Sequence, residues 1–223
     1  MEDFERKHVH KFYEESSEEF SATRYKPWPK IEYFYSKYVR KTDLVLDAGS
    51  GNGRNTFFPD RTLSLDYSSG LLGIAQRRHS GMGYIRGDLG EDLPFKQNTF
   101  DICISIAVIH HLSSEERRKT AVKSMISMLK IGGHALIYVW SESPESKASK
   151  FISIPNLEDA SLDKIDNLSA NDVFVGWKSA NKLNRYYHLF KTNELESILK
   201  DLPVNIIESG KDHGNYYAII KKV

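Results

Sequence analysis

A glycine-rich run with the sequence LDAGSGNG places one carboxylate, Asp47, shortly before three alternating glycines, Gly49, Gly51 and Gly53. Glycine permits a tight turn and lets the backbone approach a ligand closely. Taken alone, this turn is equally consistent with a structural loop and with a nucleotide or dinucleotide site. A second carboxylate, Asp66, ends another apolar stretch, LSLD. A carboxylate in this position can accept hydrogen bonds from both hydroxyls of a ribose.

A third carboxylate, Asp88, lies in the segment GDLGEDLPF, after a further short apolar run. A carboxylate there can accept a hydrogen bond from the amino group of an adenine. Ligands of parallel α/β sheets bind at the carboxyl ends of the strands. Three acidic strand ends at one edge therefore predict a cleft for an adenosine-containing ligand, although each aspartate could instead be an ordinary turn residue.

The elements that must position these residues alternate between strand and helix. Apolar runs predict strands, amphipathic runs predict helices, and the pair Gly132-Gly133 predicts the end of a helix. The expected strands are 44–47, 62–66, 83–86, 100–108, 134–140, 204–209 and 216–222, and the expected helices are 1–20, 31–40, 68–78, 115–129 and 192–200. This alternation predicts an α/β fold with a mostly parallel, doubly wound sheet and a hairpin at the end of the chain.

We expect one domain with four parts. They are an N-terminal helical region over 1–41, a cofactor-binding core over 42–140, an insertion over 141–184 and C-terminal strands over 185–223. The insertion is rich in Ser, Asn, Asp and Lys, and it interrupts the alternation of strands and helices. Loops of this length are typically functional or disordered, so we expect the insertion to be partly mobile.

The composition excludes several classes of protein. The 223 residues carry a formal net charge of +1, so any binding to nucleic acid must depend on a local patch of positive charge. The single cysteine, Cys103, excludes an intramolecular disulfide, and because no Cys and His residues have zinc-site spacing we expect no metal site in this chain. The N-terminus lacks the apolar run of a signal peptide and no apolar stretch is long enough to span a bilayer, which favours a cytoplasmic or nuclear location.

Four segments, LDAGSGNG, LSLDYS, GDLGEDLPF and FDICISIAVIHHL, resemble the successive cofactor motifs of class I methyltransferases. The resemblance implies S-adenosylmethionine as the cofactor and a Rossmann-like sheet of seven strands, of which the last is antiparallel. The glycine pattern differs from the Gly-x-Gly-x-x-Gly of nicotinamide enzymes. The residues that we assign to the cofactor on this resemblance are Asp47, Gly49, Gly51, Asn52, Gly53, Asp66, Tyr67, Asp88, Leu89, Ser105 and Ile106.

Four further stretches resemble the eukaryotic tRNA methyltransferases that esterify carboxymethyluridine at the wobble position: FSATRYKPWP, SIAVIHHLSSEERR, ALIYVW and RYYHLFKTNELESIL. These stretches are spread over most of the chain. The resemblance implies transfer of a methyl group to the carboxylate of the modified uracil, which forms a methyl ester. Two positions depart from the family pattern, because Ser50 stands where cysteine is usual and Gly176 stands where proline is expected.

The chemistry of such a reaction makes its own demands on the site. A carboxylate is ionised at neutral pH because carboxyl pKa values lie near ~4, so no general base is required. The protein must bind the carboxylate, align it and exclude water. A planar arginine fork suits this task better than a lysine. We expect Arg24 and Arg185, each beside aromatic residues, to hold the substrate's carboxylate or an adjacent phosphate, with a solvated surface position as the alternative.

Two histidines, His110 and His111, follow the fourth expected strand at the cofactor edge. We expect one of them to shape the pocket or to hydrogen-bond the uracil, while packing of the following turn stays open as the alternative.

An RNA substrate requires phosphate contacts and stacking surfaces. The expected substrate-contacting residues are Tyr25, Lys26, Trp28 and Tyr186. A second basic cluster, Arg117-Arg118-Lys119, begins an expected helix. A solvated helix face is the alternative for such charge runs.

The resembling family works as a heterodimer with a small zinc-binding activator protein. The segment Gly83–Arg86 is expected at a sheet edge, and an unpaired edge can recruit a partner. The resemblance implies such an activator, to which the zinc would belong. We expect it to dock near this edge, with an edge shielded by the chain's own loops as the alternative.

Two other functions stay open from the sequence. The chain could be a small-molecule carboxyl, O- or C-methyltransferase of the same fold, acting on a quinone or a free carboxylic acid. It could also be a cofactor-binding module without catalysis, against which the retained glycines and acidic strand ends argue.

Overall fold

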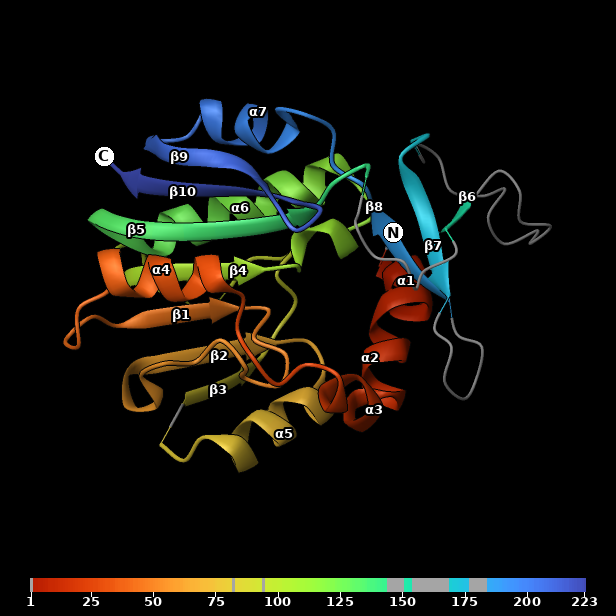
Figure 1. The fold of residues 1–223 in the computed structure, drawn as a ribbon, viewed down its shortest axis with the longest axis horizontal. Helices are drawn as coiled ribbons and strands as arrows, with labels where there is room; N and C mark the ends of the chain where they lie inside the picture. The colour runs from red at the N-terminus through yellow and green to blue at the C-terminus, as the bar shows by residue number, and fades with distance from the viewer. Residues whose placement is uncertain (1, 82, 94, 144–150, 154–168, 177–183) are drawn as a thin grey trace.

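The computed structural model describes residues 2–81, 83–93, 95–143, 151–153, 169–176 and 184–223. Its centre is a seven-stranded sheet with the strand order β3-β2-β1-β4-β5-β10-β9. The strands are β1 Val45–Ala48, β2 Thr62–Asp66, β3 Gly83–Arg86, β4 Phe100–Ile106, β5 Leu129–Trp140, β9 Val204–Asp212 and β10 Asn215–Lys222. In Figure 1 the strands β1 to β4 point their carboxyl ends toward the helices α1–α3.

The topology of the sheet confirms the predicted fold class. Strands β1 to β5 are parallel to one another, and β10 is antiparallel to both of its neighbours. The hairpin between β9 and β10 turns at His213 and Gly214, whose φ angles are 46° and 72°. Positive φ at both turn residues matches the right-handed twist of paired strands.

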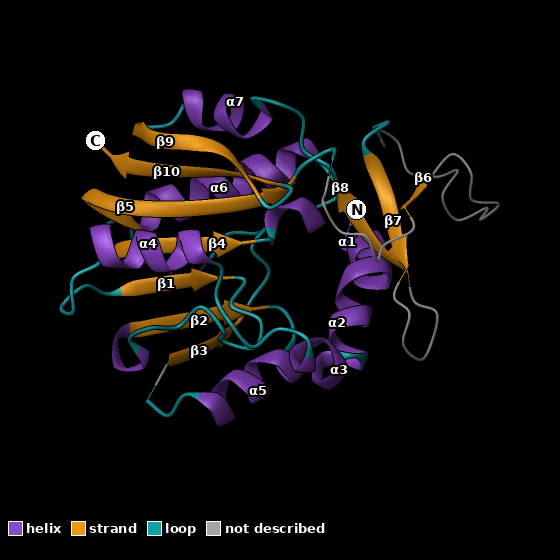
Figure 2. Cartoon of the chain, in the orientation of Figure 1, coloured by secondary structure: helices purple, strands orange, loops and turns teal. Residues whose placement is uncertain are grey.

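Helices cover both faces of the sheet in the α/β pattern (Figure 2). They are α4 Pro29–Tyr38, α5 Ser69–Arg78, α6 Glu115–Met128 and α7 Glu194–Lys200. Two of them begin at serine caps: the Ser68 hydroxyl accepts a hydrogen bond from the Leu71 amide, and the Ser114 hydroxyl accepts one from the Arg117 amide. Such caps satisfy backbone donors at a helix start and explain why the sequence begins helices there.

Successive strand residues point to opposite faces of the sheet, so the strands contribute to two separate cores. Along β4, Ile102 and Ile104 share a buried cluster with Phe34 of α4. Cys103, between them, belongs instead to the cluster that contains Met125 of α6. Burial on both faces explains why β4 reads as a continuous apolar run.

Strand β5 begins earlier than the sequence predicts. The preceding helix ends at Met128, and the chain enters the strand directly at Leu129, so Gly132 and Gly133 lie inside the strand and do not end the helix. Gly132 has a φ of +82°, and a Cβ on Gly133 would lie 2.7 Å from the carbonyl oxygen of Asp101. The glycines therefore permit an irregular, close approach of β5 to β4.

The N-terminal segment is helical, as predicted, but is divided into short pieces. They are α1 Glu2–Glu5, the π-helical η1 Arg6–His10, α2 Lys11–Glu15 and α3 Ser17–Ala22. In Figures 1 and 2 this segment lies between the main sheet and a second sheet. Residues of this segment line the cavity at the carboxyl ends of the main strands, among them Glu5, His10 and Tyr13.

The second sheet is antiparallel and has the order β6-β7-β8. Its strands are β6 Phe151–Ser153, β7 Asp172–Gly176 and β8 Asn184–His188. The expected boundary between insertion and C-terminal strands at 184/185 therefore falls inside this sheet. Within the insertion the described residues include the strands β6 and β7. The expectation that the insertion is partly mobile concerns residues that are outside those described.

Buried charges attach the second sheet to the core. His188 on β8 donates to Asp172 on β7 at 2.7 Å, and its other ring nitrogen lies 2.7 Å from a carboxylate oxygen of Glu194 in α7. Although burial opposes it, the hydrogen bonds to these two carboxylates raise the pKa of His188. A histidine between two carboxylates is favoured in its charged form. The contact of His188 with Glu194 therefore holds the second sheet, which carries Arg185, against α7.

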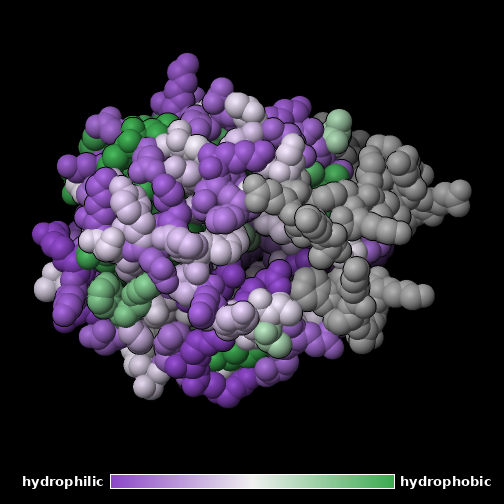
Figure 3. Space-filling view, viewed as in Figure 1, coloured by the Kyte–Doolittle hydropathy of each residue, from purple (hydrophilic) through white to green (hydrophobic). Residues whose placement is uncertain are grey.

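No helix among the described residues is long and apolar enough to cross a membrane. On the face shown in Figure 3 the described surface is mostly hydrophilic, and hydrophobic residues form small separate patches. Strands β3 and β9 form the two edges of the main sheet, which confirms the predicted edge position of β3.

Candidate active site

A cavity of about 420 Å³ opens where the carboxyl ends of the main strands meet the N-terminal helices and β8. Of the residues selected from sequence, those that line it are Arg24, Trp28, Gly49, Gly51, Asn52, Asp66, Tyr67, Asp88, Leu89, Ile106, His110, His111 and Arg185. The structure thus brings one group of expected cofactor residues and one group of expected substrate residues into a single cavity.

Six of the selected residues do not line this cavity: Asp47, Gly53, Ser105, Tyr25, Lys26 and Tyr186. Asp47, Gly53 and Ser105 are buried, while Tyr25 and Lys26 are exposed outside the cavity. The expectation for Tyr186 is corrected, because its ring is fully buried and its hydroxyl donates to Asp172 at 2.8 Å.

The glycine-rich turn after β1 is folded against β2. The amides of Gly49 and Ser50 donate to the carbonyl of Leu65, and the Gly51 amide donates to Asp66 at 2.7 Å. Gly49 has a φ of +86°, and a Cβ there would lie 2.2 Å from Val108. The turn therefore needs glycine at this position for close packing as well as for its backbone angle.

Position 51 favours glycine for a different reason. It has a φ of +54°, lines the cavity, and a Cβ built on it would meet no heavy atom within 4 Å. A side chain at this position would thus project into open space where a ligand can approach the backbone.

The Asp66 carboxylate lines the cavity and also organises it. It accepts hydrogen bonds from the Gly51 and Ser68 amides at 2.7 and 2.9 Å. Burial raises the pKa of Asp66, and these backbone hydrogen bonds oppose the rise. A carboxylate oxygen can accept more than one hydrogen bond, so Asp66 can hold the turn and still accept from ligand hydroxyls.

Asp47 is buried beside this turn. Its side chain is 0% exposed, and neither carboxylate oxygen has a hydrogen-bond partner among the described residues. Burial, with a smaller contribution from the negative charge of Asp66, raises the pKa of Asp47 to about 7. The Asp47 carboxyl is therefore a buried polar group beside the turn and is not part of the cavity lining.

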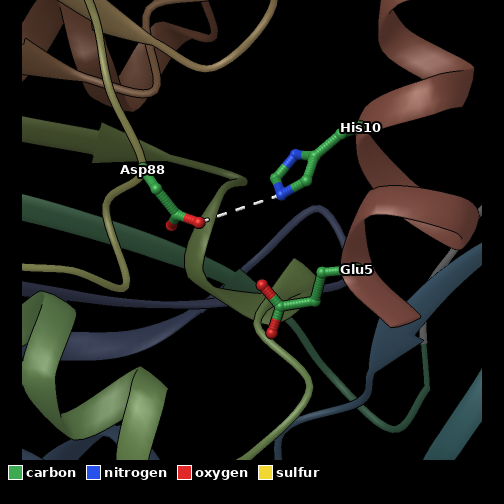
Figure 4. A group of neighbouring side chains, drawn as sticks. All are labelled: Glu5, His10 and Asp88. Atoms are coloured by element: carbon green, nitrogen blue, oxygen red, sulfur yellow. Dashed lines mark ion pairs between the residues drawn. The ribbon is translucent and has the colours of Figure 1, made fainter. Parts of the chain in front are cut away.

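The Asp88 carboxylate is held by an ionic cluster from the N-terminal helix and α6. Arg117 donates to Asp88 at 2.8 Å and to Glu5 at 3.0 Å, and His10 lies 3.9 Å from Asp88. Figure 4 shows Glu5 and His10 reaching from the N-terminal helix toward Asp88. Among the described residues these three side chains alone are close enough to hold a metal ion, but Arg117 already supplies a positive charge between the two carboxylates.

The ring of His10 stacks on Tyr67, with ring centroids 3.5 Å apart and an interplanar angle of 14°. Burial lowers the pKa of His10 to about 4, and the charge of Asp88 opposes this. His10 is therefore a neutral aromatic ring at neutral pH. Together with Leu89 and Tyr67, it gives this part of the cavity the flat apolar surfaces that favour a purine base.

Two arginines line the other end of the cavity. The Arg185 guanidinium lies 4.5 Å from the centre of the Phe12 ring, and the Arg24 guanidinium lies 4.0 Å from that of Phe20. Burial lowers the pKa of Arg24, and the charge of Arg185 contributes in the same direction. Both groups stay protonated at neutral pH because an arginine pKa lies far above 7, so this end of the cavity favours an anion.

Local contacts explain the position of Arg24. The Asn52 side-chain amide donates to the Arg24 carbonyl and to the Ser21 hydroxyl, each at 2.8 Å. A residue of the glycine-rich turn therefore anchors the segment that carries one of the expected substrate-binding arginines. This contact joins the two halves of the cavity.

The two histidines have different hydrogen-bonding states. The Trp140 amide donates to Nδ1 of His110 at 3.1 Å, so a neutral His110 carries its proton on Nε2. His111 Nδ1 lies 2.9 Å from the Tyr186 carbonyl, which only accepts, so His111 carries its proton on Nδ1. Burial lowers the pKa of His110 well below its ordinary value and lowers that of His111 to about 3.

The cavity residues that were not selected from the sequence include Tyr13, Arg54, Trp140 and Tyr187. Arg54 lies directly after the glycine-rich turn, and its guanidinium is 5.0 Å from the centre of the Trp28 ring. Burial lowers the pKa of Arg54 to about 10, and Arg24 contributes. Its position next to the turn is a signal that could have identified it.

The basic cluster Arg117-Arg118-Lys119 does not form the surface for RNA that the sequence analysis considers. Arg117 is engaged with Glu5 and Asp88, Arg118 is buried and donates to the Leu112 carbonyl, and Lys119 pairs with Glu115. The expectation of an RNA-facing basic cluster is therefore wrong for both arginines. Their charges are used to hold α6 against neighbouring segments.

Comparisons with known proteins agree with the fold. A family model described as a methyltransferase domain matches residues 46–137. A solved S-adenosylmethionine-dependent methyltransferase from Methanosarcina mazei superposes with a TM-score of 0.64 at 16% identity, covering 89% of this chain and 99% of that one. The fold and site define the protein as a class I methyltransferase that uses S-adenosylmethionine.

Relatives of similar length are closer in sequence. A protein of Encephalitozoon cuniculi, named no more specifically than a methyltransferase, is 38% identical over 98% of this chain and 97% of its own length. The tRNA (carboxymethyluridine(34)-5-O)-methyltransferase of Schizosaccharomyces pombe is 31% identical over 99% of this chain and 98% of its own. The chain belongs to the tRNA carboxymethyluridine methyltransferase family.

The residues present fit S-adenosylmethionine. The open space over Gly51, the carboxylates Asp66 and Asp88, and the flat surfaces near Tyr67 and Leu89 suit an adenosine. When bound, the cofactor supplies an electrophilic methyl group on a positively charged sulfur. The chain's own residues must hold that cofactor, bind the acceptor and align the two.

Proposed function

We propose that this protein transfers a methyl group to the carboxylate of 5-carboxymethyluridine at the wobble position of tRNA and so forms the methyl ester. The observation that carries this proposal is the presence of two arginine side chains, Arg24 and Arg185, in the same cavity as the cofactor residues. An arginine fork binds a carboxylate through two parallel hydrogen bonds. The family to which the chain belongs supports the choice of this acceptor.

The reaction balances without a proton transfer. A carboxylate oxygen forms a bond to the methyl carbon as the bond from that carbon to sulfur breaks, which yields an ester and a neutral thioether. The lowered pKa values of His110 and His111 agree with this scheme, because neither ring is tuned near neutral pH as a general base would be.

The histidines contribute by shape and hydrogen bonding. His111 is turned toward protein partners at both ring nitrogens, one being Tyr13 and the other the Tyr186 carbonyl. His110 keeps a proton on Nε2 while its Nδ1 accepts from the Trp140 amide. We therefore assign to His110 the donation of a hydrogen bond to a uracil carbonyl, and to His111 a structural role.

RNA contacts are proposed at the rim of the cavity. Tyr25 is 72% exposed and Lys26 is exposed, and both lie in the short segment between Arg24 and Trp28, which line the cavity. A base can stack on an exposed tyrosine, and a lysine can contact a phosphate. We propose that these two residues contact the nucleotides that flank the modified uridine.

We also propose that the protein works with a small activator subunit bound at β3. This strand is a sheet edge, with Gly83 and Arg86 exposed. A complex between the Haloferax volcanii Trm112 methyltransferase activator and a methyltransferase contains a chain of the same fold, with a TM-score of 0.63 at 14% identity, covering 96% of this chain and 97% of that one. An Arg86→Glu variant should weaken the complex. The Kd for S-adenosylmethionine of the isolated chain is measured beside it, because Arg86 also donates to the carbonyl of the cavity residue Tyr67 at 2.9 Å. Unchanged co-purification would contradict this docking site.

Nucleoside mass spectrometry tests the proposed reaction. Bulk tRNA from cells that lack wobble esters is incubated with the protein and S-adenosylmethionine, with and without the activator. The expected product is the methyl ester of 5-carboxymethyluridine. Methylation of a free carboxylic acid or a quinone at a comparable rate, with no ester in tRNA, would instead establish a small-molecule methyltransferase.

A further inference from the structure

Tyr13 occupies the point where three parts of the protein meet in the cavity. Its ring, on α2, packs edge-on against His111 at a centroid distance of 5.3 Å. Its hydroxyl lies 2.8 Å from Nε2 of His111, which belongs to the core, and Arg185 on the second sheet donates to the same hydroxyl at 3.2 Å. One oxygen therefore joins the N-terminal helix, the second sheet and the main fold.

The Tyr186 carbonyl determines which atoms donate in the hydrogen bonds between His111, Tyr13 and Arg185. The Tyr186 carbonyl can only accept, so the neighbouring Nδ1 of His111 must donate to it. A neutral His111 then has no proton on Nε2, and the Tyr13 hydroxyl must donate to that nitrogen. The Tyr13 oxygen is left with lone pairs that accept from Arg185. The orientation of Arg185 is thus set by a chain that ends in the backbone.

A second chain of contacts links Tyr13 to the cofactor end of the cavity. The Ser68 hydroxyl lies 3.1 Å from the Tyr13 carbonyl and donates to it, and the Ser68 amide donates to Asp66 at 2.9 Å. Hydrogen bonds of Ser68 therefore connect Tyr13, which accepts from Arg185, to Asp66, the carboxylate that we expect to bind the ribose. A displacement of α2 would alter both ends together.

We propose that Tyr13 is a positioning residue for methyl transfer, which holds the Arg185 guanidinium at the substrate end of the cavity and keeps it in register with the cofactor end. This role rests on the proposed function, because Arg185 is there assigned to the substrate's carboxylate. Tyr13 itself touches neither reacting atom in this account. Its hydroxyl acts through Arg185 and His111.

The test compares Tyr13→Phe with Tyr217→Phe in the full chain with its activator. Both variants remove one phenol hydroxyl from a ring inside the protein, and Tyr217, whose hydroxyl donates to Glu208, does not line the cavity. Loss of a hydrogen bond to a charged group predicts about a tenfold or greater fall in kcat/KM for tRNA in Tyr13→Phe. The Kd for S-adenosylmethionine should stay within about twofold, and Tyr217→Phe should match the wild type in both.

Nitrogen-15 NMR of the histidine rings gives a readout that does not depend on activity. The wild type should show His111 protonated on Nδ1, with an Nε2 resonance that moves in Tyr13→Phe and stays in Tyr217→Phe. An unchanged Nε2 resonance, an unchanged kcat/KM for tRNA, or equal losses of cofactor affinity and rate would each overturn the positioning role. If the wild-type complex esterifies no tRNA, the proposed function fails first, and the role for Tyr13 in it fails with it.

Discussion

Arg117 donates a hydrogen bond of 2.8 Å to Asp88, and the same guanidinium nitrogen lies 3.0 Å from Glu5 in the N-terminal helix. The Asp88 side chain is 18% exposed and that of Glu5 only 1%. A carboxylate that lines the cavity is therefore fixed by the same arginine that holds the N-terminal helical segment. We propose that cofactor binding and the position of this segment are linked through Arg117.

Replacing Arg117 by methionine should release the N-terminal helix. Breaking a buried ion pair from one side leaves an uncompensated charge and costs about 3 kcal/mol. Lys119→Met is a matched control, because Lys119 pairs with Glu115 on the exposed face of the same helix and should cost under ~1 kcal/mol. Urea unfolding measures stability, and calorimetry should show weaker S-adenosylmethionine binding for Arg117→Met alone. Equal behaviour of the two variants would refute the link.

Gly51→Ala should weaken cofactor binding beyond its effect on stability. Gly51 and Gly81 both have positive φ and open space in front of a built Cβ, but only Gly51 lines the cavity. Alanine in a left-handed conformation costs about 1 kcal/mol at either site. Thermal unfolding should therefore report similar losses for Gly51→Ala and Gly81→Ala, while titration should report a large rise in the cofactor Kd only for Gly51→Ala. A Kd near the wild-type value in both would mean that the ligand does not pass over Gly51.

Asp47 should make the stability of the free protein fall as pH rises. Its pKa is raised by burial from 3.8 to about 7, so between these values the folded state binds a proton that the unfolded state has lost. The loss approaches about 4 kcal/mol above pH 7, from about 1.4 kcal/mol for each unit of pKa shift. Asp47→Asn removes this ionisation, so its unfolding free energy should exceed that of the wild type at pH 8 and converge with it near pH 4. Parallel pH curves for the two proteins would contradict the raised pKa.

The rate of the methyl-transfer step should not depend on histidine protonation. Burial lowers the pKa values of all three cavity histidines, that of His10 to about 4, that of His110 well below its ordinary value and that of His111 to about 3, and a carboxylate acceptor needs no base. Single-turnover rates at saturating cofactor and tRNA should therefore be flat from pH 6 to pH 8.5. His110→Gln, which can still donate from its side chain, should retain more activity than His110→Ala. A rate that rises tenfold per pH unit in this range would show that a proton is removed in the rate-limiting step.

The cofactor end of the site could be predicted from sequence because its signals are local. Glycines and carboxylates at strand ends need only the strand–turn–helix alternation to bring them together, and Gly51, Asp66 and Asp88 all line the cavity. Asp47 shows the limit of this reasoning. The sequence predicts that Asp47 lies at the end of a strand, and it lies in the last two residues of β1. The sequence does not indicate that its carboxylate is buried beside the turn and does not line the cavity.

The substrate end depends on contacts between distant segments. Tyr13 fits the apolar face of an amphipathic helix, and nothing near it in sequence indicates a hydroxyl placed between Arg185 and His111. Arg117 is a second example. A run of basic residues predicts an RNA-binding or a solvated face, and only the fold shows that Arg117 pairs with Glu5, which is distant in sequence. A run of charged residues in the sequence does not show whether their side chains are exposed. Their burial depends on which distant segments the fold brings into contact with them.

The most direct test of the account is whether Arg24 and Arg185 recognise a carboxylate. Two anticodon stem-loop RNAs, identical except for 5-carboxymethyluridine or its neutral 5-carbamoylmethyl amide at the wobble position, are titrated against the protein with its activator and a non-reactive cofactor analogue. We expect the wild type to bind the carboxylate RNA about tenfold or more tightly than the amide RNA, and we expect Arg24→Gln and Arg185→Gln each to reduce this preference severalfold. An undiminished preference in both variants, or equal affinity of the wild type for the two RNAs, would contradict it.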